Sequence, residues 1–176
     1  MHADGMNALD TSHAKSTGNR AESEPRSREP ITVGVDGSDA SIEALRRAAR
    51  ISSALDRPLR VATVWQYPLM FGTYVPDVNW SPEDDAHAIL DAAIDDAFEI
   101  EPPRDLVRAV LRGTPAKVLI EESRHAEMLV LGSRGHGGFA GLLLGSVSAA
   151  CAERAHCPVL IIHDDGTQAS TITSST

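Results

Sequence analysis

Glycines, serines and one arginine gather in a short segment near the C-terminal end of the chain, and this combination can bind an anion. Glycine lets a ligand come close to the backbone, because it has no Cβ. Serine hydroxyls donate hydrogen bonds, and the planar guanidinium of arginine suits phosphate oxygens. A helix that starts in the segment would add unpaired N–H groups and the positive end of its dipole. The residues concerned are Gly132, Arg134, Gly135, Gly145, Ser146 and Ser148.

Known phosphate and nucleophile motifs do not describe this segment. A P-loop requires lysine after its last glycine, and the segment contains no lysine. Residues 135–140 have the spacing of part of a dinucleotide fingerprint, but that motif belongs in the first strand–helix unit of a domain. At residues 132–135 the spacing around Ser133 is wrong for a nucleophile elbow. Two interpretations remain open, a phosphate site and a glycine-rich surface loop in which Ser146 only caps a helix.

The segment lies within a regular alternation of strand-like and helix-like runs. Alternation of this kind predicts an α/β fold, an open parallel sheet with helices on both faces and right-handed crossovers. Ser38 or Asp39 begins the first helix, Ser81 the second, and Thr114 caps the third with Pro115 at its first position. The strands are predicted at residues 31–35, 59–65, 106–112, 127–131 and 158–163, and the helices at 39–51, 81–99, 116–125 and 146–155.

Polar residues follow several of the predicted strands. Asp36 follows the first strand, Arg112 and Gly113 end the third, and Gly132 ends the fourth. In open parallel sheets ligands bind at the carboxyl ends of the strands, so these residues share the edge where a ligand is expected. Asp36 also has a simpler interpretation, because Asp-Gly-Ser is a good turn and Asp can cap the first helix.

Composition limits the classes of protein to consider. Residues 1–29 and 164–176 are polar and without apolar periodicity, which predicts disordered tails around one folded domain at residues 30–163. The net charge of −9 argues against a nucleic-acid-binding protein. No apolar run is long enough for a membrane helix or has the form of a secretory signal. With two cysteines, the expected compartment is the cytoplasm.

The remaining reactive side chains do not form a recognisable site. The seven histidines are dispersed, without the short spacings of a zinc site. Cys151 and Cys157 are six positions apart and are interpreted as small buried hydrophobic residues. The loop from Tyr67 to Pro82 carries Trp80, and its aromatic side chains could cover an adenine, contact a partner or pack onto the sheet edge.

Four short motifs together resemble the universal stress protein family. The resemblance extends over about residues 30–163. The glycine signature Gly132-x2-Gly135-x9-Gly145-Ser146, placed before the last helix and strand, is similar to the ATP-binding signature of that family. The other three motifs are Val35-Asp36-Gly37-Ser38, Arg112-Gly113-Thr114-Pro115 and Cys157-Pro158-Val159-Leu160.

The resemblance implies a strand order of 3-2-1-4-5, with ATP across the carboxyl edge of the sheet. It implies that Asp36 lies beside the nucleoside and that Val64 contacts adenine. It also implies a homodimer formed by antiparallel pairing of the last strand, Val159 to Ile162. The residues implied to hold ribose and phosphates are Gly132, Gly135, Gly145, Ser146, Val147 and Ser148, with Arg134 as a further phosphate contact.

These observations lead to one main hypothesis and two alternatives. The main hypothesis is a cytoplasmic, dimeric, ATP-binding regulatory protein of the stress response, with ATP bound together with Mg²⁺. The sequence shows no clear general base placed for hydrolysis, so any ATPase activity should be slow. The alternatives are an enzyme that cleaves ATP slowly or to AMP, and a dimeric interaction module that binds no nucleotide.

Overall fold

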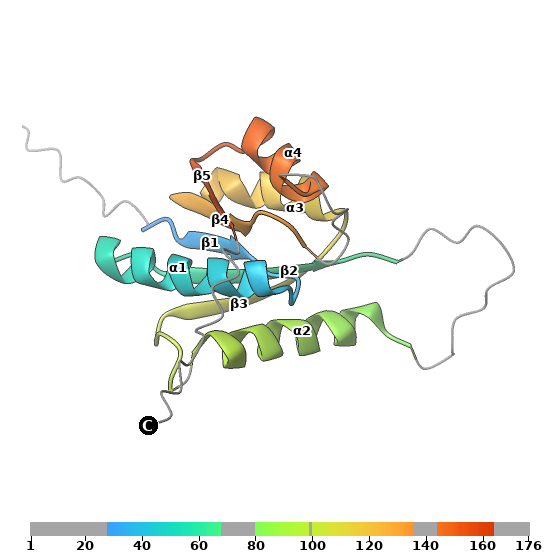
Figure 1. The fold of residues 1–176 in the computed structure, drawn as a ribbon, viewed down its shortest axis with the longest axis horizontal. Helices are drawn as coiled ribbons and strands as arrows, with labels where there is room; N and C mark the ends of the chain where they lie inside the picture. Colours follow the sequence, from blue (N-terminus) through green and yellow to red (C-terminus); the bar gives the residue numbers. More distant parts are fainter. Residues whose placement is uncertain (1–27, 68–79, 99, 136–143, 164–176) are drawn as a thin grey trace, which may run out of the picture.

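The fold is a five-stranded parallel sheet with two helices on each face (Figure 1). The structure is a computed structural model, and it describes residues 28–67, 80–98, 100–135 and 144–163. The strand order is β3-β2-β1-β4-β5, so the predicted fold class and the order implied by the resemblance are both confirmed. The two predicted tails and most of the loop between Tyr67 and Pro82 lie outside the described residues.

The elements follow one another in the predicted order. The strands are β1 (Ile31–Gly34), β2 (Leu59–Trp65), β3 (Leu106–Arg112), β4 (Met128–Gly132) and β5 (Val159–Ile162). The helices are α1 (Asp39–Leu55), α2 (Pro82–Ala97), α3 (Pro115–Glu122) with a 3₁₀ turn at Ser123–His125, and α4 (Ser146–Arg154).

Most boundaries agree with the sequence pattern, and the departures have local causes. β2 and β3 begin and end at the predicted residues. β1 ends at Gly34 rather than at residue 35, although the Val35 N–H still donates to the Ala62 carbonyl at 2.9 Å. α1 continues to Leu55, where Asp56 ends it in the left-handed conformation with φ of 51°. The last predicted turn of α3 is the tighter 3₁₀ turn.

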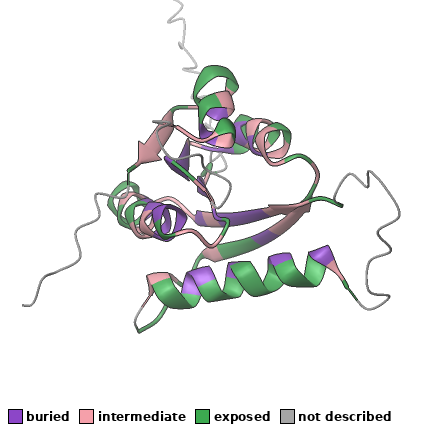
Figure 2. Ribbon diagram, turned by 45° about the vertical axis from the view of Figure 1, so that its right-hand side comes forward, coloured by how far each residue is buried: buried purple, intermediate pink, exposed green. Residues whose placement is uncertain are grey.

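Each face of the sheet has its own apolar core. α1 and α2 cover one face with a cluster that includes Leu45, Leu90 and Val61. α3 and α4 cover the other face, where Leu119, Leu131 and Cys151 are buried. Figure 2 shows the buried side of α2 turned toward the sheet and its exposed side turned to solvent. The sheet edge therefore has two separate sides on which a ligand could lie.

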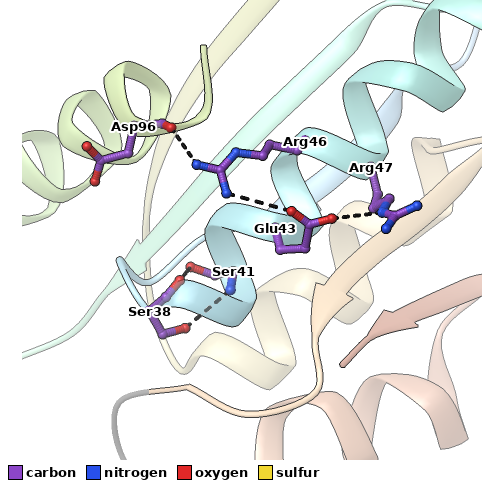
Figure 3. A network of polar contacts seen from close by, with 6 residues as sticks. All are labelled: Ser38, Ser41, Glu43, Arg46, Arg47 and Asp96. Atoms are coloured by element: carbon purple, nitrogen blue, oxygen red, sulfur yellow. Dashed lines mark hydrogen bonds and ion pairs between the residues drawn. The ribbon is translucent and has the colours of Figure 1, made fainter. Parts of the chain in front are cut away.

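A polar network joins the two helices of the first face. Arg46 of α1 donates to the carbonyl of Asp96 at 2.7 Å, near the end of α2, and forms an ion pair with Glu43 (Figure 3). Glu43 also accepts a hydrogen bond from Arg47 at 2.8 Å. The Arg46 contact satisfies one of the carbonyls that a helix leaves unpaired at its end. This hydrogen bond holds the end of α2 beside α1.

The two outer strands differ in exposure. β5 is half-buried along its whole length, whereas Val107 of β3 is 46% exposed. None of the described helices is long and apolar enough to cross a membrane.

Candidate functional site

The carboxyl ends of β1, β2 and β4 meet the start of α4 around a cavity of about 520 Å³. This volume lies within the range of small-molecule and cofactor sites. All nine residues proposed from the sequence line it, although they extend from residue 36 to residue 148 of the chain. They are Asp36, Val64, Gly132, Arg134, Gly135, Gly145, Ser146, Val147 and Ser148.

Asp36 is held in a tight turn between β1 and α1. Its Oδ1 accepts hydrogen bonds from the Ser38 N–H at 3.1 Å and from the Ser38 hydroxyl at 2.6 Å. Gly37 has a φ of 84°, a conformation that favours glycine. The simple interpretation of Asp-Gly-Ser as a turn is therefore correct. It is compatible with a ligand contact, because the exposed carboxylate of Asp36 also lines the cavity.

Two glycines allow the backbone segments around the cavity to approach one another. A Cβ on Gly132 would lie 2.8 Å from the carbonyl carbon of Ala40, so only glycine lets β4 end against the first turn of α1. A Cβ on Gly135 would overlap the carboxylate of Asp36. Gly132 therefore has a packing role in the protein itself, whereas at Gly135 an added side chain would displace only the exposed carboxylate of Asp36.

Gly145 is different, because its surroundings leave room for a side chain. An added Cβ would be 3.6 Å from its nearest neighbours, which is ordinary contact, and its φ of −71° suits any residue. Gly145 N–H donates to the Ser133 carbonyl at 2.7 Å, and Ser133 N–H donates to Ile162 of β5 at 2.6 Å. These bonds join Ser133 and Gly145 to each other and to the end of β5. Packing within the described residues therefore gives no reason for glycine at position 145.

The start of α4 supplies hydrogen-bond donors to the cavity. Its N-cap residue is Gly145, which has no side chain to cap the helix. The first N–H groups of a helix have no partner within the helix, and here they belong to Ser146, Val147 and Ser148, which line the cavity. The helix dipole adds a partial positive charge at the same place. This arrangement favours an anion.

The two serines of this turn have different roles in the structure. Ser148 is buried, and its hydroxyl donates to the Gly132 carbonyl at 2.7 Å, so it ties α4 to the end of β4. Its contribution to a bound anion would come from its backbone N–H. Ser146 is exposed and its hydroxyl points to no partner among the described residues. In this structure the single hydrogen of the Ser148 hydroxyl is thus used within the protein, and a phosphate contact of Ser148 stays a prediction for its backbone N–H.

Arg134 is the basic side chain that lines the cavity within the described part of the chain. It is exposed, and it forms no ion pair with any described residue. Its carbonyl accepts a contact of 3.5 Å from the Ser38 hydroxyl, which connects the glycine segment to the Asp36 turn. A guanidinium at the mouth of the cavity is suited to the outer oxygens of a phosphate chain.

The apolar part of the cavity was not predicted in full. The family resemblance implied Val64 from β2, but Ala62 from the same strand and Pro115 and Leu119 from α3 also line the cavity. A signal for them was present, since Gly113-Thr114-Pro115 was placed at the same sheet edge. These side chains form an apolar wall, which suits the face of a flat aromatic ring better than a phosphate.

Cys151 lies on α4 beyond the cavity, and its chemistry follows from burial. Burial raises the pKa of the Cys151 thiol to about 11, an effect that the nearby Arg154 guanidinium only partly opposes. Burial likewise raises the pKa of Cys157. Both thiols therefore stay protonated at neutral pH, as expected of small buried hydrophobic residues.

Comparisons with known proteins identify the family and its fold. A universal stress protein of Mycobacterium tuberculosis is 32% identical over 136 residues, which cover 77% of this chain and 45% of that protein. The chain thus spans about half the length of the curated relatives it matches. A crystal structure of a universal stress protein in complex with cAMP is 33% identical, covers 78% of this chain and 98% of that one, and has a TM-score of 0.58.

A more distant structure has the same fold. The universal stress protein from Archaeoglobus fulgidus in complex with dAMP is 24% identical, covers 76% of this chain and 96% of that one, and has a TM-score of 0.51. The family model described as the universal stress protein family matches residues 27–163, which include every strand and helix described above. The chain belongs to the universal stress protein family.

Proposed function

We propose that the cavity at the start of α4 binds an adenine nucleotide, with ATP as the ligand, and that the chain is a nucleotide-dependent regulatory protein of the stress response. The observation that carries the proposal is the uncapped first turn of α4, which faces a cavity with one apolar wall. An anion-binding end and an apolar wall in one cavity suit a molecule with a phosphate and a flat base. The 33%-identical relative in complex with cAMP supports the same ligand class.

The lining residues divide into two groups by chemistry. The base would lie against Val64, Ala62 and Leu119, and the ribose would lie near Asp36, whose carboxylate can accept hydrogen bonds from hydroxyls. The phosphates would lie on the N–H groups of residues 146–148, with Arg134 at the outer end. Each group of the nucleotide then contacts protein atoms that match its polarity.

Mg²⁺ fits this site only as part of the nucleotide complex. Among the described residues, no three His, Cys, Asp or Glu side chains lie close enough together to hold a metal ion. Magnesium commonly keeps several waters and takes one or two carboxylates together with substrate phosphates. Asp36 would be its protein ligand, with the phosphates of ATP supplying the rest of the coordination.

The proposal also includes the assembly and location expected from the sequence. β5 is an edge strand, and its half-buried apolar side chains, Val159 to Ile162, would be covered by antiparallel pairing with a second copy. The protein would act in the cytoplasm, where ATP binding shifts its population of conformations by the difference in affinity between them. Sedimentation velocity with a Leu160→Lys variant tests the dimer, which should dissociate.

Calorimetric titration with ATP, cAMP and AMP, each with and without Mg²⁺, tests the ligand. Gly145→Ala should keep the fold and weaken ATP binding by about tenfold or more, since the new methyl group occupies the approach to the first turn of α4. Ala149→Ser is the matched control, because it changes an exposed position of α4 outside the cavity.

The outcomes separate the competing functions. No heat with any nucleotide would leave a dimeric interaction module. Equal ATP affinity in wild type and Gly145→Ala would mean that the nucleotide does not bind at the start of α4. Chromatography of the nucleotides after a long incubation distinguishes binding alone from slow release of ADP or AMP.

A further inference from the structure

A second, smaller cavity of about 210 Å³ lies at the same sheet edge on the side of α2. It shares Val35, Asp36 and Val64 with the larger cavity, so the ends of β1 and β2 form a wall between the two. Its own residues come from β2 and from the start of α2. The larger cavity is suited to a phosphate by an arginine and an uncapped helix start. Here no arginine lines the cavity within the described residues, and the start of α2 is capped by the Ser81 side chain.

Thr63 is the buried polar residue of this second cavity. Side chains alternate along β2, and Thr63 is on the same face as Leu59 and Val61, which belong to the core under α1 and α2. The residue is 3% exposed, and its hydroxyl has no hydrogen-bond partner among the described residues. A buried hydroxyl without a partner costs free energy, which a ligand that completes its hydrogen bonding would recover.

Trp80 and Asp85 form the polar mouth of the cavity. The indole N–H of Trp80 donates to Asp85 Oδ2 at 2.8 Å, so the ring and the carboxylate are held together. Trp80 remains 41% exposed, although it precedes a helix with an apolar face that could have covered it. A carboxylate beside an aromatic ring is a combination that attracts a cation.

The other end of the cavity is apolar and already next to a cation. Trp65 lines it, and the guanidinium of Arg112 lies 5.5 Å from the centre of that ring. Arg112 also lies 5.4 Å from the ring centre of Tyr67, which packs edge-on against Trp65. A second positive charge is therefore disfavoured at this end. The cavity therefore has a negative end, where the Asp85 carboxylate lies beside Trp80, and a positive end, where the Arg112 guanidinium lies beside Trp65.

We propose that this second cavity binds a small organic cation, an ammonium group on a short apolar body. The ammonium would lie between Asp85 and the Trp80 ring and donate to the Thr63 hydroxyl oxygen, while the apolar body packs toward Ile89 and Trp65. Both carboxylates that line the cavity, Asp36 and Asp85, favour a positive ligand. The site is distinct from the nucleotide cavity, and the proposal does not depend on nucleotide binding.

Tryptophan fluorescence can test the proposal directly, because the chain has two tryptophans and both line this cavity. The probe is n-butylammonium chloride, titrated against the full chain at constant ionic strength. The neutral molecule n-butanol, which has a similar body, is the matched control ligand. We expect a saturable change in emission with butylammonium and only a weak, non-saturating change with butanol. The Trp65→Phe variant should keep the signal, since Trp80 then reports alone.

Two substitutions identify the residues that bind the probe. Asp85→Asn keeps an acceptor for the Trp80 indole and removes the charge, and it should weaken butylammonium binding by about tenfold. Asp84→Asn makes the same change of charge one position earlier on α2, outside the cavity, and should leave the affinity within about twofold. Thr63→Val should weaken binding by about fivefold without lowering the unfolding midpoint, since it removes a buried hydroxyl that lacks a partner.

The proposal is overturned by any of three results. The first is a linear emission change up to high probe concentration, which means that no site exists. The second is an equal response to butanol, which means that the cavity selects only for apolar surface. The third is equal weakening by Asp84→Asn and Asp85→Asn, which reduces the effect to the general negative charge of α2. Each result leaves the nucleotide titrations unaffected, so the two proposals fail separately.

Discussion

Helices α1 and α4 both begin at the carboxyl edge of the sheet, next to neighbouring strands, but their first turns are completed in different ways. In α1 the Ser38 side chain accepts from the Ser41 N–H (Figure 3). The Ser38 hydroxyl also donates to Asp36. In α4 the corresponding position is Gly145, which has no side chain to accept such a bond. One helix start is closed by the protein, and the other is left open toward a cavity. The open start of α4 is where the proposed nucleotide would bind.

The other two helices support this division. α2 begins at Ser81, whose side chain accepts from the Asp84 N–H at 3.2 Å, and it does not line the larger cavity. α3 begins after Thr114, which makes no capping hydrogen bond, and its first residue Pro115 lines that cavity. Three helices thus line the larger cavity with their first turns, and of these α1, through Ser41, has a side-chain cap, whereas α3 and α4 have none.

The largest effect is expected at Gly132, where the end of β4 packs against the start of α1. Gly132→Ala would place a methyl group against the backbone of Ala40 and Ser41, which cannot move without shifting α1. We expect a loss of about 3 kcal/mol in the free energy of unfolding, measured by urea denaturation. Gly145→Ala, which meets only ordinary contacts, is the control and should change stability by less than about 0.5 kcal/mol. Equal losses in the two variants would show that the packing difference between these glycines is unimportant.

The second effect concerns the far side of α4 and appears as a dependence on pH. The pKa of the Cys151 thiol is about 11 in the folded protein, whereas in the unfolded chain it is near 9. The contribution of this thiol to the free energy of unfolding is fully present below pH 9. It falls by about 2 kcal/mol as the pH rises from 9 toward 11. Unfolding curves of wild type and Cys151→Ala between pH 8 and 11 measure the difference. Parallel pH profiles for the two proteins would contradict it.

This result would also limit how far the open end of α4 acts. The helix dipole is strongest in the first turn and falls off along the helix. A thiol one turn further on whose pKa is raised shows that burial outweighs the dipole there. The groups of α4 that would attract an anion are therefore expected in its first turn, at residues 146–148.

The closed helix start gives a smaller effect. Ser38→Ala removes the cap of α1 and one donor to Asp36, and should lower the free energy of unfolding by about 1 kcal/mol. Ser146→Ala at the first position of α4 removes no capping bond and should cost less than about 0.5 kcal/mol. Thermal unfolding of both variants is the measurement. A larger loss for Ser146→Ala would mean that its hydroxyl stabilises the glycine segment.

Much of this architecture could be predicted from the sequence, for identifiable reasons. β2 and β3 were located to the residue because each is a short, mostly apolar and β-branched run between loop or turn signals. Seven of the nine cavity residues were predicted from the glycine pattern and from the rule that parallel strands bring their carboxyl ends to one edge, and Val64 and Val147 were added by the family resemblance. Both arguments use local patterns and a simple rule of topology.

The rest depends on contacts that no local pattern contains. The Ser148 hydroxyl was expected to face a ligand, but it donates to Gly132, sixteen positions away, because α4 packs against the end of β4. The unpaired hydroxyl of Thr63 was not predicted, since threonine in a strand is ordinary and only packing under α2 isolates it. Side-chain hydrogen bonds follow from the tertiary approach of elements, which the sequence pattern gives only coarsely.

The smallest change in stability gives the sharpest test of the comparison. Gly145→Ser would give α4 the kind of cap that α1 has, and should stabilise the fold by a few tenths of a kcal/mol, as measured by thermal unfolding. The same substitution should weaken ATP binding by about tenfold, because the serine oxygen takes an N–H of the first turn that a phosphate would need. Stability and affinity thus move in opposite directions, which a damaged fold cannot produce. If both rise or both stay unchanged, the open start of α4 is not where the nucleotide binds.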